Sequence, residues 1–362
     1  MSDRLKLALI FGGRSSEHEV SIMSARSIYQ AINKDKYEVF PIAITKEGRW
    51  LSPKISKKVL DDGKITSEQE QVVLITESNA SYLVNIKGDW DLKLKIDLVF
   101  PVLHGPFGED GTIQGLLEMA NLPYVGAGVA ASAVGMDKGM MKDIFKAKGL
   151  PQGNYKVIYR YMLEENMDYV IEELEDIFGY PCFVKPANLG SSVGVSKVHN
   201  REEMPKALQK AAEHDRKIIV EEYINCRELE VSVLGNDQIE VSIAGEIIPA
   251  KEFYDYEAKY ISDNSRLLIP APINEEKMEE IRALAIQAYR AIDCQGFARV
   301  DFFMERETEK ILVNEINTIP GFTRISMYPK LWEATGLSYP ELIDRLIQLA
   351  LERHTNMKRN KF

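Results

Sequence analysis

Two short segments near the C-terminal end of the chain place acidic and amide side chains where they can bind a metal ion. The first, RVD, ends at Asp301, and the second, NEIN, ends at Asn317. Side chains alternate between the faces of a strand, so Glu315 shares a face with Asn317, and Arg299 shares one with Asp301. If these strands pair through the charged turn at 305–310, the four groups converge. Two carboxylates and an amide oxygen suit Mg²⁺, and the arginine can neutralise phosphoryl charge. The alternative is an exposed face with weak surface ion pairs.

A second set of residues has the chemistry of a phosphate site. Lys185 ends an apolar segment, and the loop PANLGSSVGV that follows holds Ser191 and Ser192 between two glycines. Such a loop can turn backbone N–H groups toward phosphate oxygens. Lys138, in the segment MDK, offers a second ammonium group, although a lone lysine is more often a solvated side chain. The GxxxxGK[ST] order of a P-loop is absent.

Three carboxylates follow another apolar run. Glu221 and Glu222 end the strand signal at 218–222, and Glu228 lies six residues further along. A carboxylate there can accept hydrogen bonds from the amino group of adenine or from ribose hydroxyls. A solvated strand edge is the alternative interpretation.

Three glycine-containing loops follow predicted strands, where ligands usually bind in open sheets. The loop GGRSSEHEVS lacks the GxGxxG order of a dinucleotide site, and its Glu17 can hold an ammonium group. The loop HGPFGEDG begins with His104, one of five histidines, although a lone histidine is more often structural. The loop TIPGFTRIS offers the backbone N–H of Gly321 and the hydroxyl of Ser326, which suit a carboxylate or an oxyanion.

A framework of strands and helices must bring these residues together. Strands are predicted at 7–11, 37–44, 96–102, 155–159, 180–185, 218–222, 228–234, 296–304 and 310–317. Helices are predicted at 21–31, 112–120, 132–147, 201–213 and 339–351, with a further amphipathic helix that Asn274 caps. The alternation over the first 120 residues indicates a parallel α/β domain. We predict an α/β (α+β) chain with an N-terminal domain at 1–122, a central domain at 123–217 and a C-terminal domain at 218–362.

A polar and aromatic segment at about 250–270 has no clear period and contains three tyrosines and a phenylalanine. Loops of this length inside a domain are usually functional. A lid over a site is the preferred interpretation, and a loose surface loop is the alternative.

The composition limits the classes of function. The chain has 362 residues and a formal net charge of −10, which disfavours nucleic-acid binding through bulk charge. It has no apolar run of membrane-spanning length and no secretory leader, so we expect no membrane association and a cytoplasmic protein. Its three cysteines are widely spaced without a CxxC pair, so neither a disulfide framework nor a zinc site is predicted.

Five segments together resemble the ATP-grasp superfamily and, within it, the D-alanine–D-alanine ligases. They are GGRSSEHEVS, HGPFGEDG, KPANLGSSVGVSKV, YDYEAKYIS and GFARVDFF…VNEINTIPGFT, in family order from residue 12 to beyond residue 323. The resemblance implies an ATP-grasp fold in which an N-terminal α/β domain precedes two ATP-grasp domains that hold ATP between them. It also implies two Mg²⁺ (or Mn²⁺) and a homodimer.

The same resemblance implies roles for residues at matching motif positions. ATP binding falls to Lys138, Lys185, Ser192, Glu221, Glu222 (through its backbone) and Glu228. Metal binding falls to Asp301, Glu315 and Asn317. Substrate binding falls to Glu17, His104, Lys259 and Ser326, and stabilisation of the tetrahedral intermediate to Arg299 and the N–H of Gly321. Ser191 and Tyr260 would link with Glu17 and hold the lid closed.

The implied reaction joins two D-alanines for peptidoglycan precursor synthesis. The first carboxylate attacks the γ-phosphate to give D-alanyl phosphate, and the amine of the second D-alanine then displaces phosphate. A closed lid would protect this intermediate from water. An intact Tyr260 favours an amine over D-lactate and leaves D-serine open as second substrate. A non-catalytic nucleotide-binding protein is the remote alternative, against which the complete metal set argues.

Overall fold

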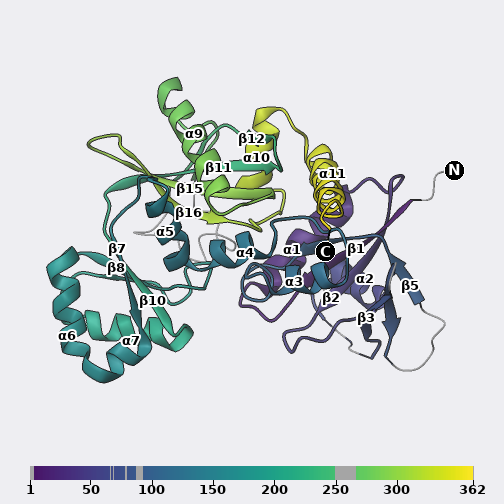
Figure 1. Ribbon diagram of the computed structural model, residues 1–362, viewed down its shortest axis with the longest axis horizontal. Helices are drawn as coiled ribbons and strands as arrows, with labels where there is room; N and C mark the ends of the chain where they lie inside the picture. The colour runs from purple at the N-terminus through teal and green to yellow at the C-terminus, as the bar shows by residue number, and fades with distance from the viewer. Residues whose placement is uncertain are drawn as a thin grey trace.

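The computed structural model describes residues 4–65, 67, 69–77, 80–86, 93–248 and 266–361. These residues form mixed α/β units around four sheets (Figure 1). The predicted α/β class is therefore confirmed. No helix in the described part of the chain is long and apolar enough to cross a membrane.

The N-terminal unit is built on a parallel sheet with the strand order β2-β1-β6. Its first strand is apolar on both faces and almost fully buried, as expected for a parallel sheet covered by helices. A small antiparallel sheet, β3-β4-β5, was not predicted and lies in the connection between β2 and β6. The elements are β1 (Leu5–Gly12), α1 (His18–Ala31), β2 (Tyr37–Ile44), α2 (Pro53–Asp62), β3 (Val72–Glu77), β4 (Ala80–Asn85), β5 (Lys93–Ile96), β6 (Leu98–Val102) and α3 (Thr112–Met119).

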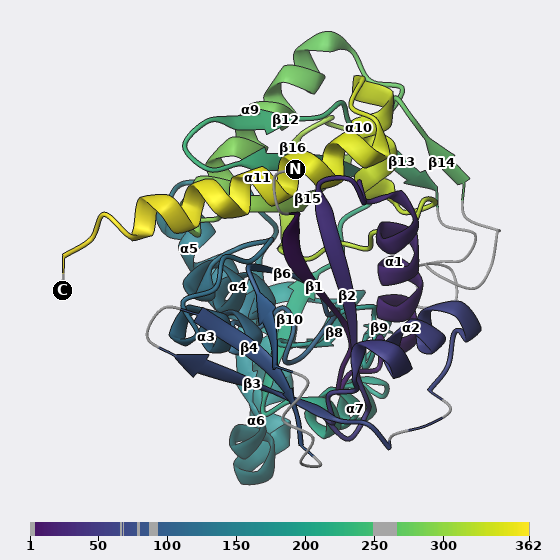
Figure 2. The same ribbon diagram turned by 90° about the vertical axis from the view of Figure 1, so that its right-hand side faces the viewer.

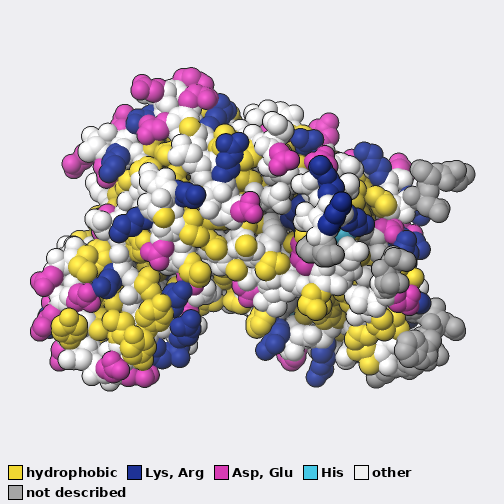
Figure 3. Space-filling model, in the orientation of Figure 1, with side chains coloured by type: hydrophobic (Ala, Val, Ile, Leu, Met, Phe, Trp, Pro, Cys, Tyr) yellow, Lys and Arg dark blue, Asp and Glu magenta, His cyan; other side chains and the backbone are white. Residues whose placement is uncertain are grey.

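The central unit is an antiparallel sheet in the order β7-β10-β8-β9, with two helices packed against it (Figure 1). The elements of this part of the chain are α4 (Val129–Met136), α5 (Lys138–Ala147), β7 (Tyr155–Tyr159), α6 (Arg160–Phe178), β8 (Cys182–Pro186), β9 (Ser196–Val198), α7 (Met204–His214) and β10 (Lys217–Glu222). In the space-filling view a notch separates the lobe of this unit from that of the N-terminal unit (Figure 3).

One sequence expectation fails here, and one helix of the central unit was not predicted. The single helix predicted at 132–147 is two helices, because Asp137 leaves the helical conformation and its side chain accepts a hydrogen bond from the N–H of Met140. This cap starts α5 at Lys138. The helix α6 was not predicted, and its apolar period is interrupted by a kink at Asn166, whose φ is −161°.

The C-terminal unit is a sheet in the order β14-β13-β11-β15-β16, with β12 paired to β11. Its elements are β11 (Cys226–Gly235), β12 (Ile239–Val241), β13 (Gly245–Ile248), β14 (Arg266–Leu268), α9 (Glu275–Ala291), β15 (Gly296–Glu305), β16 (Ile311–Asn317), α10 (Met327–Thr335) and α11 (Tyr339–Met357). The predicted cap is present, since Asn274 accepts a hydrogen bond from the N–H of Lys277 at 2.8 Å.

The last helix, α11, packs against the first strands of the chain. α11 lies across the N-terminal strands (Figure 2), and its buried Leu342, Leu346 and Ile347 share one apolar core with Leu7 and Leu9. The predicted domain boundary at 217/218 falls at the start of β10, which pairs with β7 and β8 in the central sheet. The domain limits remain a proposal.

Candidate active site

Fifteen of the seventeen predicted site residues line one cavity of about 1090 Å³, to which all three units contribute. They are Glu17, His104, Lys138, Lys185, Ser191, Ser192, Glu221, Glu222, Glu228, Arg299, Asp301, Glu315, Asn317, Gly321 and Ser326. The other two, Lys259 and Tyr260, lie outside the described residues, as does most of the lid predicted at about 250–270. Of the lid as predicted, Arg266–Leu268 forms β14, which pairs with β13.

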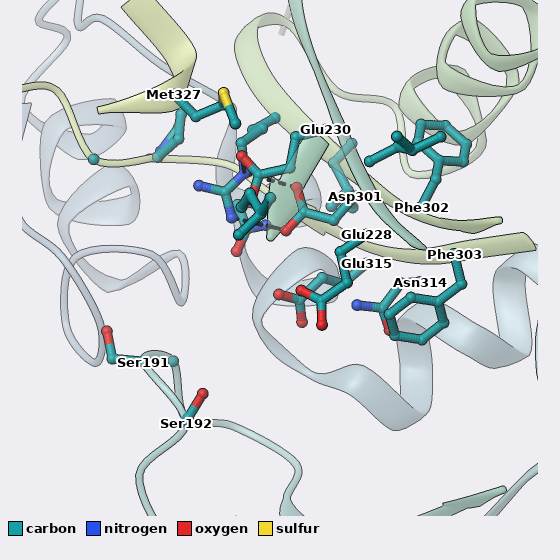
Figure 4. Close-up of a pocket in the computed structure, with 18 of the residues that line it drawn as sticks. Ser191, Ser192, Glu228, Glu230, Asp301, Phe302, Phe303, Asn314, Glu315 and Met327 are labelled. Atoms are coloured by element: carbon teal, nitrogen blue, oxygen red, sulfur yellow. Dashed lines mark hydrogen bonds and ion pairs between the residues drawn. The ribbon is translucent and has the colours of Figure 1, made fainter. Parts of the chain in front are cut away.

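The predicted metal residues stand on two paired strands, β15 and β16. Arg299 is opposite Asn317 and Asp301 is opposite Glu315, so the four side chains meet as the alternation predicts. The register shifts beyond Asp301, which leaves Asn314 without a cross-strand partner. Figure 4 shows Glu228 and Glu315 side by side, with Asp301 and Glu230 next to them.

Arg299 balances the acidic side chains of this cluster. Its guanidinium donates to both oxygens of Asp301, at 2.6 and 2.7 Å, and its Nε lies 3.1 Å from Glu230 Oε2. Asn317 Nδ2 donates to Asp301 Oδ2 at 3.0 Å. Two parallel hydrogen bonds between a guanidinium and a carboxylate form a strong and oriented ion pair. Arg299 and Asp301 therefore fix each other's position.

Lys138 connects the start of α5 to two other parts of the cavity. Its Nζ donates to the carbonyl oxygen of Leu189 at 2.8 Å and lies 3.7 Å from Glu315 Oε2. The residue before it, Asp137, caps the helix and forms an ion pair with Lys217 of β10. The ammonium group therefore stands between the glycine–serine loop and the metal residues.

A buried charge cluster lies deeper in the cavity. Glu221 Oε2 contacts the ammonium of Lys185, and Glu221 Oε1 lies 2.9 Å from the ammonium of Lys142. Burial by itself would raise the pKa of Glu221, but the two lysines hold that pKa well below its ordinary value. Burial by itself would lower the pKa of Lys185, but Glu221 and then Glu315 raise it. Glu221 and Lys185 are therefore charged at neutral pH.

The glycine–serine loop closes over the N-terminal unit. Ser191 and Ser192 both have positive φ, 51° and 59°, a conformation that costs free energy outside glycine and is typical of functional loops. The Ser191 hydroxyl donates to the carboxylate of Glu17, which is buried. A side chain at Gly105 would come within 2.9 Å of Glu17 Oε2, so glycine lets the backbone approach this carboxylate.

His104 is buried beside that carboxylate and links the N-terminal unit to the C-terminal loop. Its Nδ1 donates to the carbonyl oxygen of Ile319 at 3.0 Å and lies 3.8 Å from Glu109 Oε1. Burial by itself would lower its pKa, but Glu109 and Glu17 raise it above the ordinary value. In the same loop the N–H of Thr323 donates to Ser326 Oγ at 3.1 Å, which turns that hydroxyl toward the backbone.

Glu222 and Glu228, two of the carboxylates expected to bind adenine or ribose, differ in their surroundings. The side chain of Glu222 accepts hydrogen bonds from the backbone and side-chain nitrogens of Asn154, at 2.7 and 2.9 Å. This side chain therefore fastens β10 to the segment before β7, and the ATP contact expected from the Glu222 backbone stays a prediction. Glu228 points toward Glu315 (Figure 4).

The donor chemistry fits a shared metal–phosphate site. Among the described residues, no group of three or more His, Cys, Asp and Glu is arranged to hold a metal ion by itself. Asp301, Glu315 and Asn317 supply hard oxygen donors, and magnesium commonly completes such a shell with water and substrate phosphates. Lys138 and Lys185 line the same cavity and can balance phosphate charge.

Sequence reasoning missed three residues of the site. Lys142 lies one helical turn after Lys138 and on the same face of α5, a spacing that could have indicated it. Glu230 shares a strand face with Glu228 and stands opposite Asp301. Glu109 lies within the HGPFGEDG segment, and only the fold brings it to His104.

The comparisons with known proteins agree along the whole chain. The family model described as D-ala D-ala ligase N-terminus matches residues 6–127, and the one described as D-ala D-ala ligase C-terminus matches residues 144–348. The D-alanine--D-alanine ligase of Halothermothrix orenii is 54% identical over 349 residues, which cover 96% of this chain and 99% of that protein. That of Chloroherpeton thalassium is 51% identical over 364 residues, which cover 99% and 100%.

Solved structures lead to the same group. The D-alanine-D-alanine ligase from Coxiella burnetii has a TM-score of 0.85 at 36% identity, and covers 99% of this chain and 97% of its own. The D-Ala:D-Ser ligase from Enterococcus faecalis has a TM-score of 0.84 at 37% identity, and covers 96% and 100%. These neighbours have the ATP-grasp fold, so the fold predicted from the sequence is confirmed.

Proposed function

Because the chain belongs to the D-alanine–D-alanine ligase family, we propose that it joins two D-alanines to D-alanyl-D-alanine while it cleaves ATP to ADP and phosphate. The contact between Ser191 and Glu17 carries the proposal. It puts a buried carboxylate, which can bind an ammonium group, against a loop suited to phosphate. In an amino acid one carbon separates the ammonium from the carboxylate, so a substrate held by Glu17 presents its carboxylate to that loop.

In the first step, a carboxylate oxygen of the first D-alanine bonds to the γ-phosphorus, and the bridging oxygen leaves with ADP. Lys138 and Lys185 carry part of the phosphate charge, and Ser192 contributes to the phosphate loop. Glu221 and Glu228 hold the nucleoside, with Glu222 acting through its backbone. Asp301, Glu315 and Asn317 would hold magnesium, which supplies charge neutralisation at the transferred phosphoryl group.

In the second step, the amine of the second D-alanine attacks the acyl carbon, loses a proton, and phosphate leaves with one of the original carboxylate oxygens. Arg299 and the N–H of Gly321 stabilise the oxyanion of the tetrahedral intermediate. Ser326 binds the carboxylate of the second D-alanine, and His104 helps to orient the first. Roles for Lys259 and Tyr260 in the lid, and assembly as a homodimer, stay predictions.

The identity of the second substrate follows from relatedness. The D-alanine–D-alanine ligases of Halothermothrix orenii and Chloroherpeton thalassium share 54% and 51% identity with this chain, and the D-Ala:D-Ser ligase from Enterococcus faecalis shares 37%. D-Alanine is therefore favoured over D-serine and D-lactate. A non-catalytic nucleotide-binding protein would not need all three metal donors, and Asp301, Glu315 and Asn317 are all present in this chain.

The test is ADP release by the purified protein with Mg²⁺ and ATP, with products identified by mass spectrometry. Parallel reactions contain D-alanine, L-alanine, D-alanine with D-serine, or D-alanine with D-lactate. The proposal predicts turnover that requires D-alanine and yields D-alanyl-D-alanine. Turnover with L-alanine alone, or a mixed product that dominates when D-serine is present at equal concentration, would contradict it.

A further inference from the structure

Lys142 is a buried cation for which the reaction described above has no role. Its side chain is 4% exposed, and its ammonium lies 2.9 Å from Glu221 Oε1. It also lies 5.8 Å from the centre of the Tyr155 ring, and Tyr155 stands opposite Glu221 on β7. An ion at this depth loses several kcal/mol of hydration, so its surroundings must compensate for that loss.

Glu221 lies between two ammonium groups that approach different oxygens. Lys142 comes from α5 to Oε1, and Lys185 comes from β8 to Oε2. The two lysines differ in access to the cavity, because the side chain of Lys185 is 17% exposed and that of Lys142 is 4% exposed. The two ammonium groups share one contacting carboxylate, Glu315 and Glu228 also raise the pKa of Lys185, and Lys185 is the lysine that an anion in the cavity can reach.

Phosphate oxygens would supply that anion and compete with Glu221 for the more accessible lysine. Lys185 then turns partly toward the nucleotide, and Glu221 would be left as a buried carboxylate with a weakened partner. An uncompensated buried charge is strongly destabilising. Lys142 would remain at Glu221 Oε1 and continue to neutralise this carboxylate when Lys185 turns toward phosphate.

We propose that Lys142 is a positioning residue of the nucleotide site, the permanent counterion that keeps Glu221 charged and fixed when Lys185 engages phosphate. The proposal rests on the proposed function, since it assumes that ATP binds in this cavity. The low pKa of Glu221, for which Lys142 is the largest favourable cause, is consistent with it. Lys142 acts through Glu221 and does not contact the reacting atoms.

The first test replaces Lys142 by methionine, which keeps the length of the side chain and removes its charge. We expect the dissociation constant and the KM for ATP to rise roughly 30-fold, since loss of one partner of a buried charge pair weakens binding by at least this factor. The KM for D-alanine should change less than about twofold, and Lys142→Arg should recover most of the ATP affinity. Binding of ATP is measured by calorimetry, independently of turnover.

The matched control is Lys146→Met, one turn further along α5, where the lysine is exposed. It should leave the affinity for ATP unchanged. Thermal unfolding of each variant shows whether it is folded. Equal losses for Lys142→Met in ATP and D-alanine KM, or no loss in ATP affinity, would overturn the proposal.

A double-mutant cycle tests the route through Glu221. In a Glu221→Gln background there is no carboxylate to neutralise, so adding Lys142→Met should change ATP affinity less than about threefold. A full 30-fold loss in that background would overturn the proposal, and this comparison still applies if Lys142→Met alone does not fold. A protein that binds ATP with this Lys142 dependence but makes no dipeptide would refute the proposed function and leave this inference intact.

Discussion

The guanidinium of Arg299 donates two parallel hydrogen bonds to the carboxylate of Asp301, a residue two positions away on the same face of β15. Asp301 is also a proposed metal ligand. Arg299 therefore neutralises and orients a carboxylate that would also hold the metal. Arg299 also lines the cavity in which the reacting carbon would lie, so one side chain would serve both the carboxylate and the oxyanion.

Replacement of Arg299 by lysine tests this double role. Lysine keeps the charge but cannot make the fork contact. We expect kcat to fall roughly 100-fold, the usual loss for an oxyanion donor, while the KM for ATP changes little. Steady-state kinetics measure both, with Arg290→Lys on the exposed end of α9 as control. A kcat within about threefold of the unaltered chain would remove Arg299 from the oxyanion site.

Glu315→Gln tests the metal assignment, because glutamine has the same shape but is a poor ligand for magnesium. We expect kcat to fall roughly 100-fold and the affinity for Mn²⁺, measured by electron paramagnetic resonance in the presence of ADP, to fall by at least about tenfold. The control is Glu307→Gln in the exposed turn between β15 and β16. Intact turnover and Mn²⁺ binding would show that Glu315 is not a ligand.

Glu17→Gln tests the ammonium site, since it removes the charge and keeps the size of the side chain. We expect the KM for the first D-alanine to rise at least about tenfold, while the KM for ATP stays nearly constant. Glu19→Gln, two residues along on α1, removes only a surface ion pair with Lys46 and should behave like the unaltered chain. Similar KM values for D-alanine in the two variants would place the ammonium group elsewhere.

The buried Glu221 cluster predicts a particular response to acid. Because the folded-state pKa of Glu221 is lowered, its contribution to stability is present above its ordinary pKa near 4.5 and is lost as pH falls below that value. At pH 7 we expect Glu221→Gln to lower the free energy of unfolding by about 3 kcal/mol. Urea unfolding from pH 7 to pH 3 should show this difference shrinking below about pH 4.5. Curves that stay parallel over the whole range would contradict the assignment.

The part of the site that depends on strand periodicity could be predicted from the sequence. Arg299 and Asp301 alternate on one strand, Glu315 and Asn317 alternate on the next, and the short charged turn between the strands sets their pairing. The structure has this register. Motifs at strand ends were informative for a similar reason, since Glu17 and His104 follow buried strands, Lys185 lies near the end of β8, and all three reach the same cavity.

Other parts depend on long-range contacts that no local pattern contains. Lys142 occupies an ordinary position on an amphipathic helix, and only the docking of α5 against β10 turns it into the partner of Glu221. Glu109 meets His104 because the loop after β6 folds back on itself. The prediction continued one helix from α4 into α5, and the break at Asp137 becomes visible through its capping hydrogen bond.

The most direct test of the central claim follows one atom through the reaction. D-Alanine labelled with ¹⁸O in both carboxylate oxygens is incubated with the protein, Mg²⁺ and ATP, and the phosphate and dipeptide are analysed by mass spectrometry. Attack of the carboxylate on the γ-phosphorus predicts one ¹⁸O in the released phosphate for each D-alanyl-D-alanine formed. Unlabelled phosphate, or phosphate released without dipeptide, would contradict ligation through a D-alanyl phosphate.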